Sequence, residues 1–302
     1  MPANFNVLYT QQFASAVELI AQQKRSRIAS TFTQESVEGK SATVVDFVGS
    51  IELDERTTLY DDIIPKDVDH FRPYVYPRHF DGAIFFDDIE KMQANANPQS
   101  AYLQDEVAAM YRAQDREAIR AFFDTRTLDM ASGSQQSQAF NFGNNRVVDV
   151  NVGGATSGLN VQKLQKLKVL MKQSEVGMDD DELIHIAISP VEESQLMDEI
   201  EVTSSDFTRK SILDAGTIVG SMFMGFDFIV TNQLPTDANG YRRLPAWTTR
   251  GMSFATWDGG THTDVSQRKD KRGHPWQVYI KGSFGAVRRD ENRVYEIKAN
   301  EA

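Results

Sequence analysis

The clearest pattern of hydrophobic and polar positions lies between residues 97 and 125 and predicts a long amphipathic helix. Its apolar residues recur at intervals of three and four, which places them on one stripe: Leu103, Val107, Met110, Tyr111, Ala118 and Phe122. The other faces are expected to carry the charged residues Arg112, Asp115, Arg116, Glu117 and Arg120. Pro98 and Ser100 supply a helix start signal. At a rise of about 1.5 Å per residue the helix is on the order of 35 Å long, so it can serve as a spine.

The residues before this helix carry two other patterns. Residues 5–29 repeat apolar positions at helical spacing and end in positive charge, which predicts an N-terminal helix. Residues 30–39 are polar and are interpreted as a connector. Because the helical pattern has no obvious local core, residues 1–39 are interpreted as an arm that packs elsewhere. The first helix of an ordinary domain fits the same pattern equally well.

From residue 40 the period of the pattern changes to two. Residues 41–53 are rich in β-branched side chains and residues 70–80 alternate aromatic ones, so both predict β-strands, joined by a long acidic tip. Pro73 and Pro77 have no N–H to donate, so the second strand is expected at a sheet edge or in a free ribbon. An isolated ribbon is only marginally stable in water. We therefore expect this hairpin to dock on another surface, such as a neighbouring subunit.

Beyond the long helix, helical and strand patterns alternate. Residues 130–158 are rich in Gly, Ser, Gln and Asn and predict a loop with one short strand at 146–152. Ser189 and Glu192 have the spacing of a capping box, with Pro190 at the first helical position. The other expected elements are a helix at 160–173, a buried strand at 183–189, helices at 191–202 and 205–214, and strands at 222–233, within 242–257 and on both sides of a turn at 289–292.

Two features of this half raise the question of nucleic-acid or nucleotide binding. One face of the helix at 160–173 carries four lysines, which are interpreted as a solvated face: Lys163, Lys166, Lys168 and Lys172. Gly158 stands before that helix, but Leu159 and Asn160 follow where a phosphate-binding loop has Lys and Ser or Thr. Nucleotide binding is therefore not expected, and the glycine-rich passage is interpreted as a connection between domains.

Composition narrows the class of protein further. The chain has 302 residues, of which 40% are hydrophobic, enough for two or three packed units. It has no cysteine, so disulfides and thiolate chemistry are excluded, and no apolar segment approaches the ~20 residues of a membrane span. Neither is there a signal-peptide pattern, so we expect the protein to stay in the cytosol. A net charge of −11 argues against a surface built to grip nucleic-acid phosphates.

The order of elements, a helical arm, a long acidic hairpin and then the long helix, resembles the major capsid proteins of tailed bacteriophages with the Hong Kong 97-type shell fold. The resemblance runs from about Val17 to Lys298 and rests on four phrases taken in order, residues 39–92, 187–207, 224–235 and 269–298. It implies an α+β fold in which the hairpin is the extended loop that lies over an adjacent subunit. The long helix is then the spine of the peripheral domain.

The resemblance also implies a domain order. The axial α/β domain of such proteins meets its copies around the five-fold and six-fold axes. The implied divisions are an N-terminal arm at 1–39, the extended loop at 40–83, a peripheral domain at 84–152 with its spine helix at 99–124, the axial domain at 153–261, and returning strands of the peripheral domain at 262–302.

Charge is distributed unevenly along the chain. The hairpin tip is acidic, and the region near residue 270 is basic. Opposite charges on one molecule suit a heterologous, repeating contact, although a solvated face needs no partner. The candidates for subunit contact are Asp54, Glu55, Arg56, Asp61, Asp62, Lys66, Asp67 and Asp69 on the hairpin, and Arg268, Lys269, Lys271 and Arg272 near the C-terminus.

The sequence contains few of the motifs that indicate a catalytic site. No G-x-S-x-G elbow occurs, and the five histidines show no H-E-x-x-H spacing. The oxygen-rich cluster of Asp61, Asp62, Asp67, Asp69 and His70 is the best metal candidate, but a hydrated acidic turn is the favoured interpretation. Some relatives of the resembled fold crosslink lysine to asparagine, and Lys66 is the only lysine on the hairpin tip. No such crosslink is predicted, and neither a cofactor nor a catalytic residue is expected.

The sequence therefore predicts a structural protein, a major capsid subunit that tiles an icosahedral shell around double-stranded DNA. The expected partners are many copies of itself in pentamers and hexamers, a separate scaffolding protein, a portal and a decoration protein, with no membrane. The DNA is expected to be enclosed without tight binding, and the shell to be assembled in the bacterial cytoplasm and to form part of the virion. The alternatives are the shell of an encapsulin-like nanocompartment and, from another class, a metal-dependent hydrolase using the Asp61 cluster.

Overall fold

The computed structural model describes residues 22–49, 51–55, 65–86, 99–130, 133–141, 145–152, 154–177, 182–199, 217–220 and 222–301. The chain divides into two compact units. The first comprises the described residues within Met1–Ser26, His79–Ala113 and Gly259–Ser283. The second comprises those within Arg27–Arg78, Gln114–Asp258 and Phe284–Ala302. Each unit is thus assembled from segments that lie far apart in the sequence.

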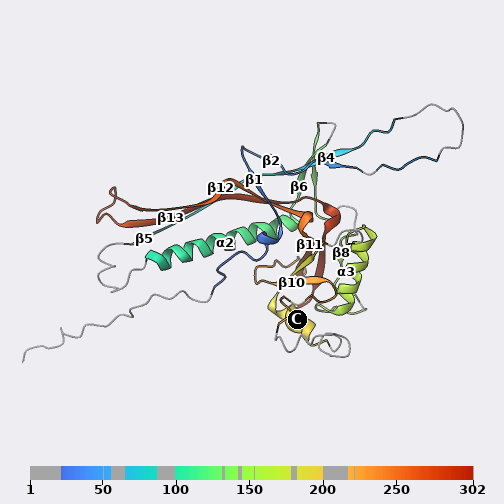
Figure 1. Ribbon diagram of the computed structural model, residues 1–302. Coiled ribbons are helices and arrows are strands. Elements are labelled where there is room, and N and C mark those ends of the chain that lie inside the picture. The colour runs from blue at the N-terminus through green and yellow to red at the C-terminus, as the bar shows by residue number, and fades with distance from the viewer. Residues whose placement is uncertain are drawn as a thin grey trace, which may run out of the picture. The chain divides into compact units, whose positions relative to one another are not determined.

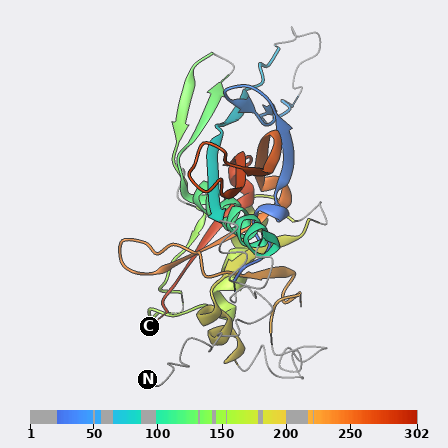
Figure 2. The same cartoon turned by 90° about the vertical axis from the view of Figure 1, so that its left-hand side faces the viewer.

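The predicted spine helix is present as α2 (Gln99–Phe123), seen along its length in Figure 1 and almost end-on in Figure 2. Ala118 and Phe122 of the predicted apolar stripe are fully buried. Asp115 and Glu117, expected on the outer faces, are buried as well, with 0% and 8% of their surface exposed. That expectation was wrong because both carboxylates have partners in other chain segments, which periodicity does not reveal.

Side chains of α2 hold the segment that precedes the first strand. Gln22 Nε2 donates to Asp105 at 2.8 Å, and Arg112 Nη1 donates to Gln22 Oε1 at 2.5 Å. Further along the helix, the Asp115 carboxylate accepts the backbone N–H groups of residues 27–29 at 2.9 to 3.1 Å. Three hydrogen bonds to one carboxylate fix the backbone of this segment.

The N-terminal predictions need correction. Most of the predicted helix at 5–29 lies outside the described residues, and its described part, 22–28, is not helical. The expected connector contains the 3-10 turn η2 (Ala29–Thr31) and the strand β1 (Thr33–Val37). The partner of β1 is residues 253–257, to which it runs parallel. A polar segment becomes a strand here because its hydrogen-bonding partner comes from the other end of the chain.

Three sheets organise the described chain. The first has the order β1-β12-β13-β5, formed with β12 (Met252–Gln267), β13 (Trp276–Arg288) and β5 (Arg78–Phe86). The second has the order β10-β9-β11-β14-β8 and consists of β10 (Phe226–Val230), β9 (Ile184–Ile188), β11 (Arg242–Thr248), β14 (Val294–Ala299) and β8 (Val147–Val148). The third contains the inner part of the predicted hairpin and is described below.

The second sheet contains the predicted α/β elements. β9 is buried at every position and runs parallel to β10, and the capping box of Ser189 and Glu192 opens α4 (Pro190–Met197). α4 is shorter than predicted, and the expected helix at 205–214 lies outside the described residues. β14 pairs with β11 and β8, so the two strands around the predicted turn, now η4 (Glu291–Arg293), belong to different sheets. The division into domains stays a prediction.

α3 (Val161–Gln173) matches the predicted helix, but its lysines do not form one solvated face. Lys163 is completely buried, and its Nζ donates to the carbonyls of Ser157 and Lys298 at 2.6 and 2.9 Å. Lys168 Nζ donates to a backbone carbonyl at 2.7 Å. A long aliphatic stem with a satisfied amine fits a core position, which the pattern of charges alone does not indicate.

The strands of the third sheet differ from those of the predicted hairpin. The first predicted strand is reduced to two short pieces, β2 (Ala42–Thr43) and β3 (Phe47–Val48), which both pair with β4 (His70–Val75). The second breaks at Pro77 into β4 and β5, which lie in different sheets. β4 is also paired on its other side, so Pro73 is not at an edge.

The register explains how a central strand accommodates Pro73. Between the β2 and β3 pairs, residues 44–46 lie opposite only residues 72 and 73, which is a β-bulge. The Pro73 carbonyl accepts the Val44 N–H at 3.2 Å, and no N–H is required of Pro73 in return. Bulges are one of the few places where a sheet tolerates proline.

A hairpin that the sequence did not predict completes the third sheet. β6 (Arg126–Met130) pairs with β4, and β7 (Gln135–Gln138) pairs with β6. β7 falls in residues 130–158, which were expected to be mostly loop because Gln, Ser and Gly have low strand propensity, and no element was predicted at residues 126–129. Pairing with an existing strand overrides that propensity.

An aromatic cluster forms part of the core of the second unit. Phe32, Phe122 and Trp247 meet with ring centroids 4.7 to 5.9 Å apart, and all three are nearly or fully buried. The cluster joins the end of α2 to β11 and to the residue before β1. Within the described residues, no helix is long and apolar enough to cross a membrane.

Candidate subunit interface

The outer part of the extended loop is exposed and acidic. Asp54, Glu55, Lys66, Asp67 and Asp69 are all exposed, whereas the candidates Arg56, Asp61 and Asp62 lie outside the described residues. Lys66 Nζ contacts Asp54 at 2.8 Å and donates to the carbonyl of Glu52 at 2.7 Å. The one described lysine of the tip therefore bridges the two arms of the loop, and the other carboxylates give the described part of the tip a negative charge.

The inner part of the loop contains a polar cluster that joins Asp46, in the bulge before β3, to His70 and Arg72 of β4. Arg72 Nη2 donates to Asp46 Oδ2 at 2.9 Å, and His70 Nδ1 lies 3.4 Å from Oδ1 of the same carboxylate. The hydrogen bond from Arg72 lowers the pKa of Asp46. Asp46 sits in the bulge opposite Pro73, so the bulge aims its carboxylate at β4. Beside the cluster lies a hollow of about 400 Å³ that Asp129 also lines.

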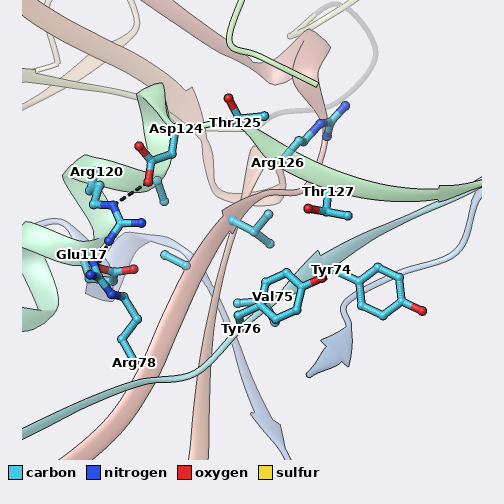
Figure 3. Close-up of a pocket in the computed structure, with 13 residues that line it drawn as sticks. Tyr74, Val75, Tyr76, Arg78, Glu117, Arg120, Asp124, Thr125, Arg126 and Thr127 are labelled. Carbon is cyan, nitrogen blue, oxygen red and sulfur yellow. Dashed lines mark hydrogen bonds and ion pairs between the residues drawn. The ribbon is translucent and has the colours of Figure 1, made fainter. Parts of the chain in front are cut away.

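The loop root, residues 76–78, is where the second arm of the loop meets the body of the second unit. A Cβ placed on Gly285 of β13 would lie 2.4 Å from the Tyr76 carbonyl oxygen, so only glycine allows this approach. Arg78 Nη1 contacts Glu117 Oε2 of α2 at 3.0 Å. Tyr76, Arg78 and Glu117 line a cavity, and Figure 3 shows their side chains around it. The volume of the cavity is about 250 Å³. Neither the glycine contact nor the ion pair has a signal in the sequence.

The basic turn, residues 268–275, joins β12 to β13 in the first unit. Arg268 is held by Asp270 at 2.8 and 2.9 Å and by Gln277 at 2.7 Å, and its hydrogen bond lowers the pKa of Asp270 to about 2. Lys269, Lys271 and Arg272 are exposed. The turn therefore has a defined backbone and presents positive charge from three side chains.

Comparison with known proteins identifies the family. A family model described as phage capsid protein matches residues 6–301. The chain belongs to this family of phage capsid proteins. No curated protein matches the chain.

Solved capsid structures share the fold of this capsid protein. The cyanophage Pam1 capsid has a TM-score of 0.74 at 10% identity, with 100% of both chains covered. The cyanophage P-SCSP1u capsid has a TM-score of 0.73 at 13% identity, covering 98% of this chain and 94% of the other. The Ralstonia phage GP4 capsid has a TM-score of 0.69 at 12% identity, covering 99% and 97%. The predicted capsid fold, mixed helix and sheet, is thereby confirmed.

Neither alternative to a capsid protein is favoured by these findings. Two members of the proposed metal cluster, Asp61 and Asp62, lie outside the described residues, and the described residues contain no group of three or more His, Asp or Glu that could hold a metal. His185 contacts Asp227 at 2.8 Å and Thr249 at 3.5 Å, the residue types of a hydrolytic triad. The His185 ring packs on Trp247, with centroids 5.6 Å apart, and the residue is 6% exposed, so this arrangement is part of the core.

Proposed function

We propose that this capsid protein is the major subunit of an icosahedral shell that encloses the double-stranded DNA of a tailed phage. The observation that carries the proposal is the family match over residues 6–301, joined to a fold shared with three phage capsids over at least 98% of the chain. Copies associate in pentamers and hexamers through heterologous contacts that close into rings. Assembly takes place in the host cytoplasm, with a scaffolding protein, a portal and a decoration protein as partners.

The proposed contact joins the acidic loop tip of one copy to the basic turn of another. On the loop, Lys66 is already engaged by Asp54, so Glu55, Asp67 and Asp69 carry the outward charge. On the turn, Asp270 neutralises Arg268, so Lys269, Lys271 and Arg272 carry it. The internal pairs leave each patch with a net charge of one sign, which favours encounter between copies in one orientation.

Each such ion pair contributes only about 0–1 kcal/mol because both partners are exposed and screened by salt. The shell does not need strong single contacts, since each copy engages several neighbours at once and the contacts reinforce one another. The charge contact therefore acts mainly on register and on the rate of assembly. Assembly is expected to slow as ionic strength rises.

The DNA is enclosed without tight binding. With 43 acidic and 32 basic residues the subunit has a net charge of −11, which disfavours tight binding to phosphates. A high-affinity DNA complex of the purified subunit at physiological salt contradicts this part of the proposal. Shells purified from cells should contain nuclease-protected double-stranded DNA, whereas a cargo enzyme in its place would indicate a nanocompartment.

Sedimentation and electron microscopy of the purified protein test the proposal. We expect closed shells, or sheets and tubes of rings, either alone or with a scaffolding protein. The combined variant Lys269→Glu, Lys271→Glu and Arg272→Glu should assemble poorly, and adding Asp67→Lys with Asp69→Lys should restore assembly. The matched control keeps the charge, with Lys269→Arg, Lys271→Arg and Arg272→Lys, and should assemble normally. Loss of assembly in the control, or no rescue, overturns the charge contact but leaves the shell function standing.

A further inference from the structure

Burial separates the acidic from the basic residues of α2. The helix carries four acidic and three basic residues. Three of the acids are buried, since Glu106, Asp115 and Glu117 expose 6%, 0% and 8% of their surface. The fourth, Asp105, is half-buried and accepts a hydrogen bond from Gln22 at 2.8 Å. The charge that α2 presents to solvent is therefore mainly basic, although its sequence has more acids than bases.

The basic residues lie on one face of the helix. Arg112, Arg116 and Arg120 are four residues apart, which places successive side chains on the same face and about 6 Å apart along the axis. Arg120 is neutralised by Asp124, whose Oδ2 lies 2.5 Å from its Nε (Figure 3). Arg116 is exposed and forms no ion pair with any described residue, so its charge is free to meet a partner.

The segment that precedes β1 adds two more cations. Arg112 Nη1 donates to Gln22 Oε1 at 2.5 Å and to the Gln23 carbonyl at 3.3 Å, which ties this segment to the helix. Both acceptors are neutral, so Arg112 keeps its positive charge. Lys24 and Arg25 follow directly in the chain and are exposed. No acidic residue occurs between residues 22 and 30. We call Lys24, Arg25, Arg112 and Arg116 the basic strip.

The buried acids of α2 reduce the charge of the basic strip only in part. The Asp115 carboxylate is compensated by the backbone N–H groups of residues 27–29. Glu117 pairs with Arg78 at 3.0 Å. Burial raises the pKa of Glu106 and raises that of Glu117 to about 7, which disfavours the negative charge of both. The outward charge of the strip is therefore positive, on a subunit whose net charge is −11.

We propose that the basic strip is a contact surface for the phosphate backbone of double-stranded DNA. The inference rests on the proposed function, because the shell would hold DNA close to every subunit. DNA carries one negative charge per about 1.7 Å of its axis, so cations about 6 Å apart along α2 can each meet a phosphate. Lysine and arginine contacts to phosphate carry no sequence information, which suits a shell that encloses a whole genome.

The strength of the contact follows from the number of phosphates neutralised. Each one contributes about −0.9 to the slope of the logarithm of affinity against the logarithm of salt concentration. Four contacts give a slope of about −3.6, so the affinity falls by about 150-fold when the salt concentration rises fourfold, from about 50 to about 200 mM. We therefore expect binding at low salt and little at physiological salt, in keeping with DNA that is enclosed without tight binding.

Fluorescence anisotropy of a labelled DNA duplex, titrated with the unassembled full-length subunit at several salt concentrations, tests the strip. The strip variant combines Lys24→Gln, Arg25→Gln and Arg116→Gln. None of these three side chains has an ion-pair or hydrogen-bond partner among the described residues, so the fold should be retained. The slope should change from about −3.6 to about −0.9, and the affinity at low salt should fall by at least about 100-fold for duplexes of any sequence.

The matched control removes the same charge from the basic turn, with Lys269→Gln, Lys271→Gln and Arg272→Gln. These side chains are also exposed, so the control has the same net charge as the strip variant. It should keep the slope of the parent protein. Equal losses in the two variants would show a general effect of net charge and would overturn the proposal. So would a parent protein that does not bind DNA at low salt, or a strip variant that binds like the parent.

Poly-glutamate tests whether an acidic protein, such as a scaffold, is the partner instead. Binding of poly-glutamate to the strip without binding of DNA overturns the proposal. Electron microscopy of the same preparations, after assembly, separates this test from that of the shell. If the parent and the strip variant both form shells but the DNA test fails, only the strip is wrong. Absence of shells counts against the proposed function, whatever the anisotropy shows.

Discussion

Arg288 is the residue whose loss we expect to cost most, because it satisfies the C-terminal end of the spine helix from inside the core. It is 0% exposed. Its guanidinium donates to the carbonyls of Ala121 and Phe122 at 3.1 and 2.9 Å and to that of Asp124, and it pairs with Glu291 at 2.9 Å. The last carbonyls of a helix have no partner within the helix. Here the Arg288 side chain, 164 to 167 residues away in sequence, supplies the missing hydrogen-bond donor.

Arg288→Met keeps most of the volume and removes the charge. It leaves the buried carboxylate of Glu291 with only the longer contact to Arg126 at 3.4 Å, while the other carboxylate oxygen already has no hydrogen-bond partner in the described structure. The helix carbonyls that Arg288 serves also lose their donor. Breaking a buried pair by removing one partner costs about 3–5 kcal/mol, a large share of the roughly 5–15 kcal/mol that stabilises a typical domain. We therefore expect the free energy of unfolding to fall by about 3–5 kcal/mol.

Urea denaturation of the unassembled subunit, followed by tryptophan fluorescence, measures this change. The midpoint should fall with little change in slope, since the surface exposed on unfolding stays the same. Arg116→Met, on the exposed face of α2, is the matched control and should cost within about 0.5 kcal/mol. In a background of Glu291→Gln the cost of Arg288→Met should be smaller. A loss below about 1 kcal/mol, or equal losses with and without Glu291, refutes the reasoning.

Three further perturbations probe other buried contacts. Gly285→Val should lower stability by about 1–3 kcal/mol in thermal unfolding, because the new side chain meets the Tyr76 carbonyl; an unchanged melting temperature contradicts the close approach. Asp115→Ala removes the acceptor of three backbone N–H groups and should cost about 1–3 kcal/mol and expose residues 27–29 to protease; equal cleavage of both proteins speaks against this. Burial lowers the pKa of Lys163 from 10.5 to about 8, so between these values the folded chain binds fewer protons than the unfolded chain and stability rises with pH. Urea midpoints at pH 8 and pH 10 should show this rise in the parent protein and a smaller one in Lys163→Met; parallel changes in the two proteins rule out the assignment.

Elements with local signals could be predicted from the sequence. The spine helix and α3 follow from apolar residues at helical spacing, and the start of α4 follows from Ser189, Pro190 and Glu192, which lie within four residues of one another. Each of these signals acts over one or two helical turns. The capsid fold was predicted from a resemblance to a known family, carried by four sequence phrases taken in order, and the family match confirms it.

Features that depend on distant partners could not be predicted. β1 exists because residues 253–257 lie beside it, and β14 joins β11 instead of its neighbour in sequence, β13. Pro73 indicated an edge strand, but the bulge at residues 44–46 removes the need for its N–H. The candidate contact residues on the loop tip and in the basic turn could be chosen from the sequence by charge alone, because charged residues are usually exposed.

The buried charged residues show most clearly why some predictions from the sequence failed. A pattern of hydrophobic and polar positions assigns every charged residue to the solvent, because burying an unpaired charge is costly. Asp115, Glu117 and Arg288 depart from that rule, and each is paired with a segment at least 39 residues away in sequence. They fasten the N-terminal segment, the loop root and β13 to the same helix. Specific charged contacts thus attach three distant segments of the chain to one amphipathic helix.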